Sequence, residues 1–184
     1  MVNQAVIETN RLHLRPLRPD DLDAMHAYLG DPQTMLYYPA PFSREFVKEW
    51  LVRNEDRFEQ YGYGLFGVVL KESGELIGDC GLVWQDLPDG PELEVGYHFH
   101  RLHWGRGYAT EAARASMEYA FCNAGVDHVI SLTRPENLPS RRVAERNGLT
   151  ISRRVTWKEL LHDVWRKDRP DDMRRVTPDV ARPR

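Results

Sequence analysis

The segment from Leu93 to Glu111 constrains the fold most, because it predicts a strand, a glycine-containing loop and a helix in immediate succession. Apolar and polar side chains alternate through residues 93–100, as expected of a strand with two different faces. Two glycines lie in the loop 104–109, and a helix rich in small residues follows. The start of a helix offers unpaired N–H groups and the positive end of the helix dipole, so it attracts phosphate. We therefore predict that an anionic, phosphorylated ligand binds beside a strand that carries the Glu94 carboxylate.

Length, composition and charge limit the class of protein. A chain of 184 residues that is 41% apolar fits one domain with an ordinary core, and this composition excludes a wholly disordered chain. The net charge of −3 gives no signal for nucleic acid as a partner. No apolar run approaches the ~20 residues of a membrane-spanning helix, so no membrane partner is expected. Cys80 and Cys122 lack the spacing of metal ligands, so we expect no metal, reduced thiols and a cytoplasmic protein.

Alternation, helical spacing and turn residues predict one mixed α/β domain over residues 1–169, followed by a flexible tail over residues 170–184. The three strands between residues 63 and 99 are expected to form an antiparallel meander, because turn-forming residues separate them. The expected strands are 11–15, 63–70, 76–84, 93–99, 128–133, 149–157 and 160–167, and the expected helices are 20–29, 43–58, 109–120 and 137–146.

The glycine loop also has to be compared with the motifs of nucleotide-binding folds. The dinucleotide motif GxGxxG fails here, because Thr110 stands where the third glycine is required. A P-loop is excluded, because no Gly-Lys-Ser/Thr sequence follows. Gly105 and Gly107 could also simply make a tight turn between strand and helix. From the loop alone, this interpretation and anion binding are about equally favoured.

The surrounding sequence favours anion binding, because residues from Thr9 to about Arg169 resemble the GNAT superfamily of N-acetyltransferases. The family loop reads Gln/Arg-x-x-Gly-x-Gly/Ala, and here Trp104 replaces its first polar residue. The segments ETNRLHLRPLRPDD, EVGY, WGRGYATEA and ENLPSRRVAERNGL are similar to those of one subgroup, the ribosomal-protein alanine and serine N-acetyltransferases. The resemblance implies an α+β fold with a mostly antiparallel central sheet of about seven strands and helices on both faces. It also implies a splay between the strand 93–99 and the strand 128–133.

The resemblance implies acetyl-CoA as co-substrate. Main-chain amides from Gly105 to Thr110 would hold its pyrophosphate, and Arg106 could add a charged contact. The pantetheine arm would lie in the splay, and a main-chain N–H near Phe99 or His100 would polarise the acetyl carbonyl. The expected cofactor-binding residues are Phe99, His100, Trp104, Gly105, Arg106, Gly107, Tyr108, Ala109, Thr110 and Asn137.

Two residues are candidates for acid–base chemistry. Glu94 is the first candidate for the base, although it could instead face solvent or pair with an arginine. Ser140 lies where a hydroxyl could protonate the leaving sulfur, or it could serve the helix start that Asn137 is expected to cap. Many family members use a tyrosine as the acid, and its absence from residues 140–146 leaves the acid open. His98 and His100 are each interpreted as polar surface residues or loop anchors.

The expected activity is direct transfer of an acetyl group to a primary amine, either a protein N-terminus or a small molecule. The alternative is a non-catalytic acyl-CoA-binding or regulatory module on the same scaffold. Either could be a monomer or a homodimer. The residues expected on the acceptor side are Tyr37, Tyr38, Phe42 and Trp84.

Overall fold

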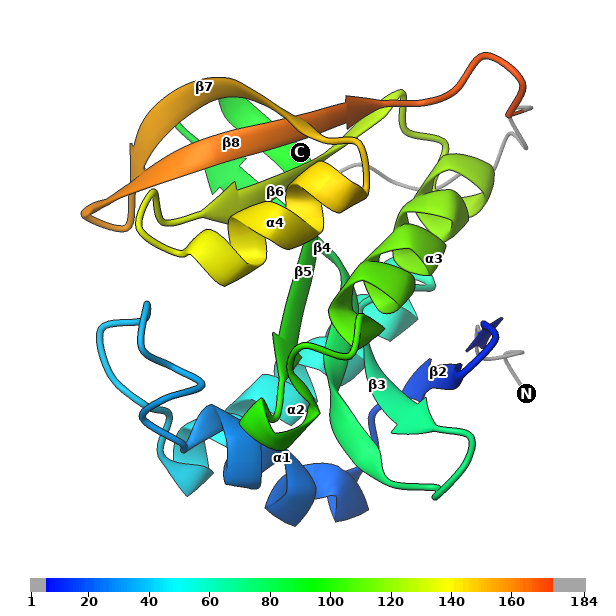
Figure 1. Ribbon diagram of the computed structural model, residues 1–184, viewed down its shortest axis with the longest axis vertical. Coiled ribbons are helices and arrows are strands. Elements are labelled where there is room, and N and C mark those ends of the chain that lie inside the picture. Colours follow the sequence, from blue (N-terminus) through cyan, green and yellow to red (C-terminus); the bar gives the residue numbers. More distant parts are fainter. Residues whose placement is uncertain (1–5, 174–184) are drawn as a thin grey trace.

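A mixed eight-stranded sheet runs through residues 6–173, the part of the chain that the computed structural model describes (Figure 1). Its strand order is β1-β2-β3-β4-β5-β6-β8-β7. Residues 174–184, most of the expected tail, lie outside the described residues. The strands are β1 (Ile7–Glu8), β2 (Leu12–Pro16), β3 (Leu65–Leu70), β4 (Leu76–Leu87), β5 (Gly90–Phe99), β6 (His128–Thr133), β7 (Thr150–Trp157) and β8 (Leu160–Asp168). The α-helices are α1 (Leu22–Leu29), α2 (Arg44–Tyr61), α3 (Tyr108–Asn123) and α4 (Leu138–Arg146).

One pair of neighbouring strands, β5 and β6, is parallel, and all the others are antiparallel. The β5–β6 register consists of a single pair, Glu94 with Ile130, and β5 runs away from β6 beyond it (Figure 1). The expected splay between these strands is therefore confirmed. The sheet has one strand more than expected because β1 is only two residues long, too short to show an alternating pattern.

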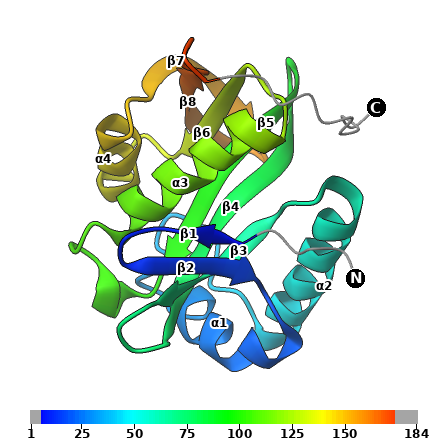
Figure 2. The same ribbon diagram turned by 90° about the vertical axis from the view of Figure 1, so that its right-hand side faces the viewer.

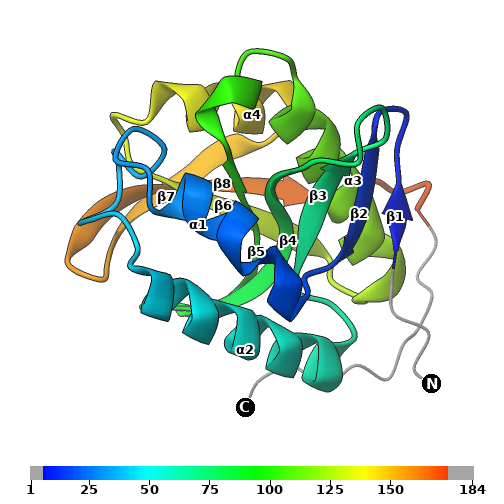
Figure 3. The ribbon, with the colours of Figure 1, turned by 90° about the horizontal axis from the view of Figure 1, so that it is seen from below.

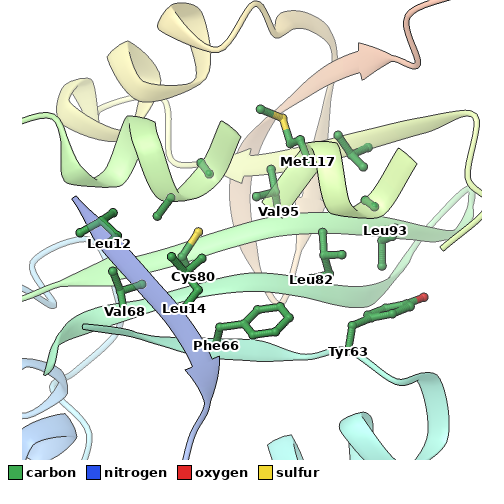
Figure 4. Close-up of a cluster of buried hydrophobic side chains, with 14 of the residues drawn as sticks. Leu12, Leu14, Tyr63, Phe66, Val68, Cys80, Leu82, Leu93, Val95 and Met117 are labelled. Atoms are coloured by element: carbon green, nitrogen blue, oxygen red, sulfur yellow. The ribbon is translucent and has the colours of Figure 1, made fainter. Parts of the chain in front are cut away.

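Helices cover both faces of the sheet, as expected: α3 and α4 lie on one face, and α1 and α2 lie on the other (Figures 2 and 3). The side of α3 that meets the sheet carries small buried residues, among them Ala112, Ala113 and Ser116. Small side chains let this helix lie close to β4 and β5. Figure 4 shows the resulting core, in which Val95 of β5, Cys80 of β4 and Met117 of α3 are buried together.

The helix ends follow the local signals in the sequence. The Ser43 hydroxyl accepts a hydrogen bond from the N–H of Phe46 and caps α2, and Gly62 ends that helix with φ of 75°. The hairpin between β4 and β5 is tighter than expected. Leu87 pairs with Gly90, so Pro88 and Asp89 alone make the turn, whereas the expected strands 76–84 and 93–99 left a longer link between them.

Within residues 6–173, no helix is long and apolar enough to cross a membrane. In the same range, no group of three or more His, Cys, Asp or Glu side chains is placed to hold a metal ion. Cys80 and Cys122 are free thiols, and burial raises the pKa of Cys80 to about 12.

Candidate active site

The glycine loop ends directly at the start of α3. Gly105 and Gly107 have φ of 74° and 80°, a region that residues with a side chain rarely adopt. Gly107 is the N-cap, and its carbonyl accepts the first helical hydrogen bond, from the N–H of Glu111. The N–H groups of Tyr108, Ala109 and Thr110 therefore have no partner within the helix. The predicted donors at residues 108–110 therefore lie at the start of α3 without a helical partner.

Arg11, at the end of the β1–β2 link, forms hydrogen bonds that hold this loop in place. It lies 100 positions before its partner Glu111 in the sequence. Its guanidinium donates to the Arg106 carbonyl at 2.9 Å and to Glu111 Oε2 at 2.7 Å, and it lies over the Tyr108 ring at 4.5 Å. In a trans peptide the C=O and the following N–H point in opposite directions. Holding the Arg106 carbonyl therefore turns the N–H of Gly107 away from Arg11. The sequence assigned Arg11 no role, because nothing local signals this contact.

A pocket of about 740 Å³ adjoins the loop and the outer side of α3. It is bordered by Glu8, Thr9, Arg11, Gly105, Arg106, Gly107, Thr110, Glu111, Arg114, Ala115, Glu118 and Arg146. Glu111 does not oppose an anion here, because Arg11 neutralises its charge at 2.7 Å. Burial raises the pKa of Glu111, but its bonds to Thr9 and Arg11 outweigh burial and leave the pKa below the ordinary value. Four arginines and three glutamates line the pocket, and Arg11 neutralises one of these glutamates, so the balance of charge favours an anion.

The end of β5 fixes which main-chain donor can face the splay. The N–H of His100 donates to the Ile77 carbonyl at 2.9 Å, so it belongs to the β4–β5 pairing. Neighbouring residues of a strand direct their N–H groups to opposite edges, so the N–H of Phe99 faces the edge that β6 has left. This corrects the expectation that the His100 amide could polarise the acetyl carbonyl. The His100 side chain instead accepts from the N–H of Leu102 at 3.3 Å, and the Trp104 indole donates to the Phe99 carbonyl at 2.7 Å.

Glu94 lies where β5 and β6 part. Its carboxylate accepts from Gln85 Nε2 at 2.6 Å through one oxygen and from the N–H of Leu132 at 3.1 Å through the other. Each oxygen keeps a further lone pair. Burial raises the pKa of Glu94, although the two donors act in the opposite direction. A carboxylate with a raised pKa at the splay is suited to accept a proton.

Across the splay, α4 begins with the expected cap. Asn137 Oδ1 accepts from the N–H of Ser140 at 3.2 Å. The Ser140 hydroxyl lies 2.9 Å from the hydroxyl of Tyr97. The Tyr97 ring does pack against the core, but its hydroxyl crosses from β5 to α4. Burial raises the pKa of Tyr97, so the phenol stays protonated. The sequence search for a tyrosine near Ser140 missed it, because it comes from another element.

The loop after α1 brings aromatic side chains to the Glu94 face of β5. The rings of Tyr38 and Phe42 lie 5.7 Å apart, and Trp50 of α2 lies 5.5 Å from Phe42 and 6.0 Å from His98. Tyr37 is half-buried in the same loop. Two of the expected acceptor-side residues, Tyr38 and Phe42, are therefore brought together beside β5.

Trp84 is not on this face of the sheet. It pairs with Leu93, whereas Glu94 pairs with Val83, and cross-strand partners point to the same face. Trp84 therefore lies on the opposite face from Glu94, where its indole donates to the Tyr63 hydroxyl at 3.1 Å. This corrects the expectation that Trp84 lines the acceptor side with Tyr38 and Phe42.

His98 is partly buried and both of its ring nitrogens have partners, unlike the surface residue or loop anchor that the sequence suggested. Its Nδ1 lies 2.8 Å from Asp79 Oδ1, and its Nε2 lies 2.7 Å from the Tyr38 hydroxyl. The other Asp79 oxygen accepts from the Tyr28 hydroxyl at 2.9 Å. The two hydrogen-bond partners of His98 come from two other segments, so the only sequence signal was that His98 shares a strand face with Glu94.

Known proteins are similar to this chain in sequence and in fold. Residues 11–150 match the model of the acetyltransferase (GNAT) domain family. The uncharacterised protein YkkB of Bacillus subtilis (strain 168) is 36% identical over 148 residues, which cover 80% of this chain and 86% of that protein. An acetyltransferase of Agrobacterium tumefaciens has a solved structure with a TM-score of 0.80 and 28% identity, covering 92% of this chain and 97% of that one.

Solved structures that share the fold include ribosomal-protein acetyltransferases. RimL, a ribosomal-protein α-N-acetyltransferase solved in complex with coenzyme A, has a TM-score of 0.73 and 19% identity, covering 89% of this chain and 98% of that one. At this identity, the likeness concerns the fold alone.

Proposed function

This chain belongs to the GNAT acetyltransferase family, and from this premise we propose that it transfers an acetyl group from acetyl-CoA directly to a primary amine. The observation that carries the proposal is that one domain combines a glycine loop leading into the start of α3 with a carboxylate, Glu94, at the splay of the sheet. The first group suits a diphosphate, and the second suits proton transfer from an amine.

On the donor side, the loop and the end of β5 would supply the contacts to acetyl-CoA. The N–H groups from Gly105 to Thr110 would hold the diphosphate, with Arg106 as a charged contact at its side. A Cβ added at Gly105 would meet nothing within 4 Å, so the loop leaves the space around it open. The N–H of Phe99 faces the splay and would polarise the thioester carbonyl, whose carbon then accepts the amine.

The acceptor side supplies the proton transfers. Glu94 would take a proton from the amine nitrogen as the C–N bond forms. The departing thiolate needs a proton, and the paired hydroxyls of Ser140 and Tyr97 are the candidate donors. Tyr97 is therefore our candidate for the tyrosine acid that many family members use. The segments that resemble the ribosomal-protein alanine and serine N-acetyltransferases make peptide N-termini candidate acceptors, together with polyamines, amino acids and amino sugars.

A screen with thiol detection tests this function. The protein is incubated with acetyl-CoA and a panel of amines and peptide N-termini, and free CoA is measured. In parallel, calorimetry compares binding of acetyl-CoA, NAD and ATP. We expect acetyl-CoA alone to bind tightly and CoA release to depend on an amine. Binding without release for every amine would favour the non-catalytic acyl-CoA-binding module instead.

A further inference from the structure

We propose that Tyr38, His98 and Asp79 form a proton relay that takes the first proton from a positively charged amine acceptor, leaving the second for Glu94. The inference rests on the proposed function, because it assigns residues to the acceptor half of an acetyl transfer. Tyr38 is the member that would touch the substrate. Asp79 and Tyr28 act through His98 and are positioning residues.

The relay is a continuous chain of hydrogen bonds from the sheet interior to the surface. At its inner end, Asp79 is fully buried, and its two oxygens are held by Tyr28 at 2.9 Å and by His98 at 2.8 Å. At its outer end, Tyr38 lies 2.7 Å from His98 Nε2 and is 42% exposed. The side chain of His98 is only 9% exposed. A proton can therefore enter the chain at Tyr38.

The Asp79 carboxylate determines which atom donates and which accepts in each hydrogen bond of the relay. A carboxylate only accepts hydrogen bonds, so Nδ1 of His98 is the donor to Asp79. Neutral His98 then has its lone pair on Nε2 and accepts from the Tyr38 hydroxyl. The Tyr38 oxygen is left free to accept a hydrogen bond from a substrate N–H. Each step of an inward proton transfer thus has a donor and an acceptor already in place.

Gly96 leaves the strand open between the two proton acceptors. Glu94, Gly96 and His98 share one face of β5, because side chains alternate along a strand. A Cβ added at Gly96 would find only the Glu94 carboxyl carbon within 4 Å, at 3.9 Å. An acceptor nitrogen placed over Gly96 would therefore have Glu94 on one side and the Tyr38–His98 pair on the other.

The chemistry of a protonated amine needs two acceptors. The ammonium group has three N–H bonds and the amide product has one, so two protons leave the nitrogen. The first passes to the Tyr38 oxygen while the Tyr38 proton moves to His98 Nε2, which leaves a neutral amine and an imidazolium beside Asp79. The second passes to Glu94 as the C–N bond forms and the C–S bond breaks. The sulfur takes one proton from the Ser140–Tyr97 pair, and one proton in total is released to solvent.

The charges around His98 support this assignment. Burial lowers the pKa of His98, but the Asp79 carboxylate more than offsets burial, and the pKa lies above its ordinary value. The groups that face the ring are Asp79 of β4, Glu94 of β5, the Tyr38 hydroxyl and the Trp50 edge of α2. The charged groups among them are both carboxylates. These two carboxylates stabilise a positive charge on His98, and they equally stabilise a positively charged amine substrate.

Two small amines that differ in charge test the relay. Ethylamine is protonated near neutral pH, whereas trifluoroethylamine, of similar shape, is mostly neutral in slightly alkaline buffer. We expect His98→Gln to lower kcat/KM for ethylamine about 100-fold and for trifluoroethylamine less than about 10-fold, because a neutral amine skips the first proton transfer. Tyr38→Phe should show the same dependence on charge. The matched control is His13→Gln, since His13 also pairs with a carboxylate, Glu8, but on the outer strands.

A pH profile separates a relay from a structural contact. The carboxylate of Asp79 raises the pKa of His98, so Asp79→Asn should lower that pKa and move the acidic limb of kcat/KM for ethylamine to lower pH. Each variant is first checked for acetyl-CoA binding, and Tyr38→Phe carries the test if the buried substitutions prevent folding. Equal losses of kcat/KM with both amines would overturn the relay. So would an acidic limb of the pH profile that Asp79→Asn does not move. Absence of CoA release by the unmodified protein with every amine would instead overturn the proposed function.

Discussion

The glycine loop at residues 104–110 and the polar face of β5 border the same splay of the sheet, but they are built from different kinds of group. The loop offers main-chain N–H groups, whose directions follow from two glycines with positive φ and from one helix start. The face of β5 offers side chains, and each depends on partners from other elements, as Glu94 does on Gln85 and Leu132.

This difference determines what a substitution can do on each side. A main-chain site depends on backbone conformation, so most side chains in the loop can change while the donors stay in place. A side-chain site loses its function when one functional atom is replaced, even if the backbone does not move. Donor binding and acetyl transfer are therefore expected to respond to separate sets of substitutions.

The largest effect is expected at Glu94. Glu94→Gln keeps the shape but removes the proton acceptor, so kcat should fall about 1,000-fold while the Kd for acetyl-CoA stays unchanged. Steady-state kinetics and calorimetry measure the two quantities. The control is Glu92→Gln on the same strand face, whose carboxylate serves His128 and Arg153. Undiminished turnover in Glu94→Gln would remove Glu94 from the mechanism.

A smaller effect, on binding, is expected at Gly107. Gly107→Val forces a β-branched residue to φ of 80°, so the Kd for acetyl-CoA should rise about 100-fold, or about 2.7 kcal/mol. Gly74→Val imposes the same strain in the β3–β4 turn, where φ is 75°, and should leave the Kd unchanged. If Gly107→Val bound acetyl-CoA as tightly as the unmodified protein, the loop would not be the diphosphate site.

A still smaller effect is expected at Arg11, which connects the loop to the body of the domain. Arg11→Lys keeps the charge but cannot bond Glu111 and the Arg106 carbonyl together, so we expect the Kd for acetyl-CoA to rise about 10-fold. Arg53→Lys is the control, because Arg53 makes an exposed pair with Glu49 at 3.6 Å. An unchanged Kd in Arg11→Lys would show that the loop holds its conformation without the hydrogen bonds of Arg11.

The smallest effects are expected at the helix caps. Asn137→Ala and Ser43→Ala each remove one cap, and each should lower the free energy of unfolding by about 1 kcal/mol. Only Asn137→Ala should also slow acetyl transfer, because the start of α4 positions Ser140. Denaturant unfolding and kinetics on both variants measure this contrast. Equal effects on transfer would mean that the start of α4 has no special part in the site.

The sequence predicted the features that are encoded locally. The starts of α2 and α4, the bounds of β6 and the glycine loop all follow from caps, glycines and alternation within a few residues. The face of Trp84 could not be predicted, because it depends on the register of the β4–β5 hairpin. A shift of one residue in register moves a side chain to the other face, and the turn was expected to be longer than it is.

The side-chain networks were beyond prediction for a related reason. Arg11 meets Glu111 across 100 positions, Tyr28 meets Asp79 across 51 and Tyr38 meets His98 across 60. No local pattern records such contacts, because they exist only once the sheet and helices have packed. The main-chain donors were visible in the sequence, whereas the partners of His98 were not.

The most direct measurement is a crystal structure of the protein with acetyl-CoA. We predict the diphosphate within hydrogen-bond distance of the main-chain N–H groups from Gly105 to Thr110, and the thioester carbonyl on the N–H of Phe99. A diphosphate bound elsewhere, with the loop amides facing solvent, would contradict the assignment of the donor side.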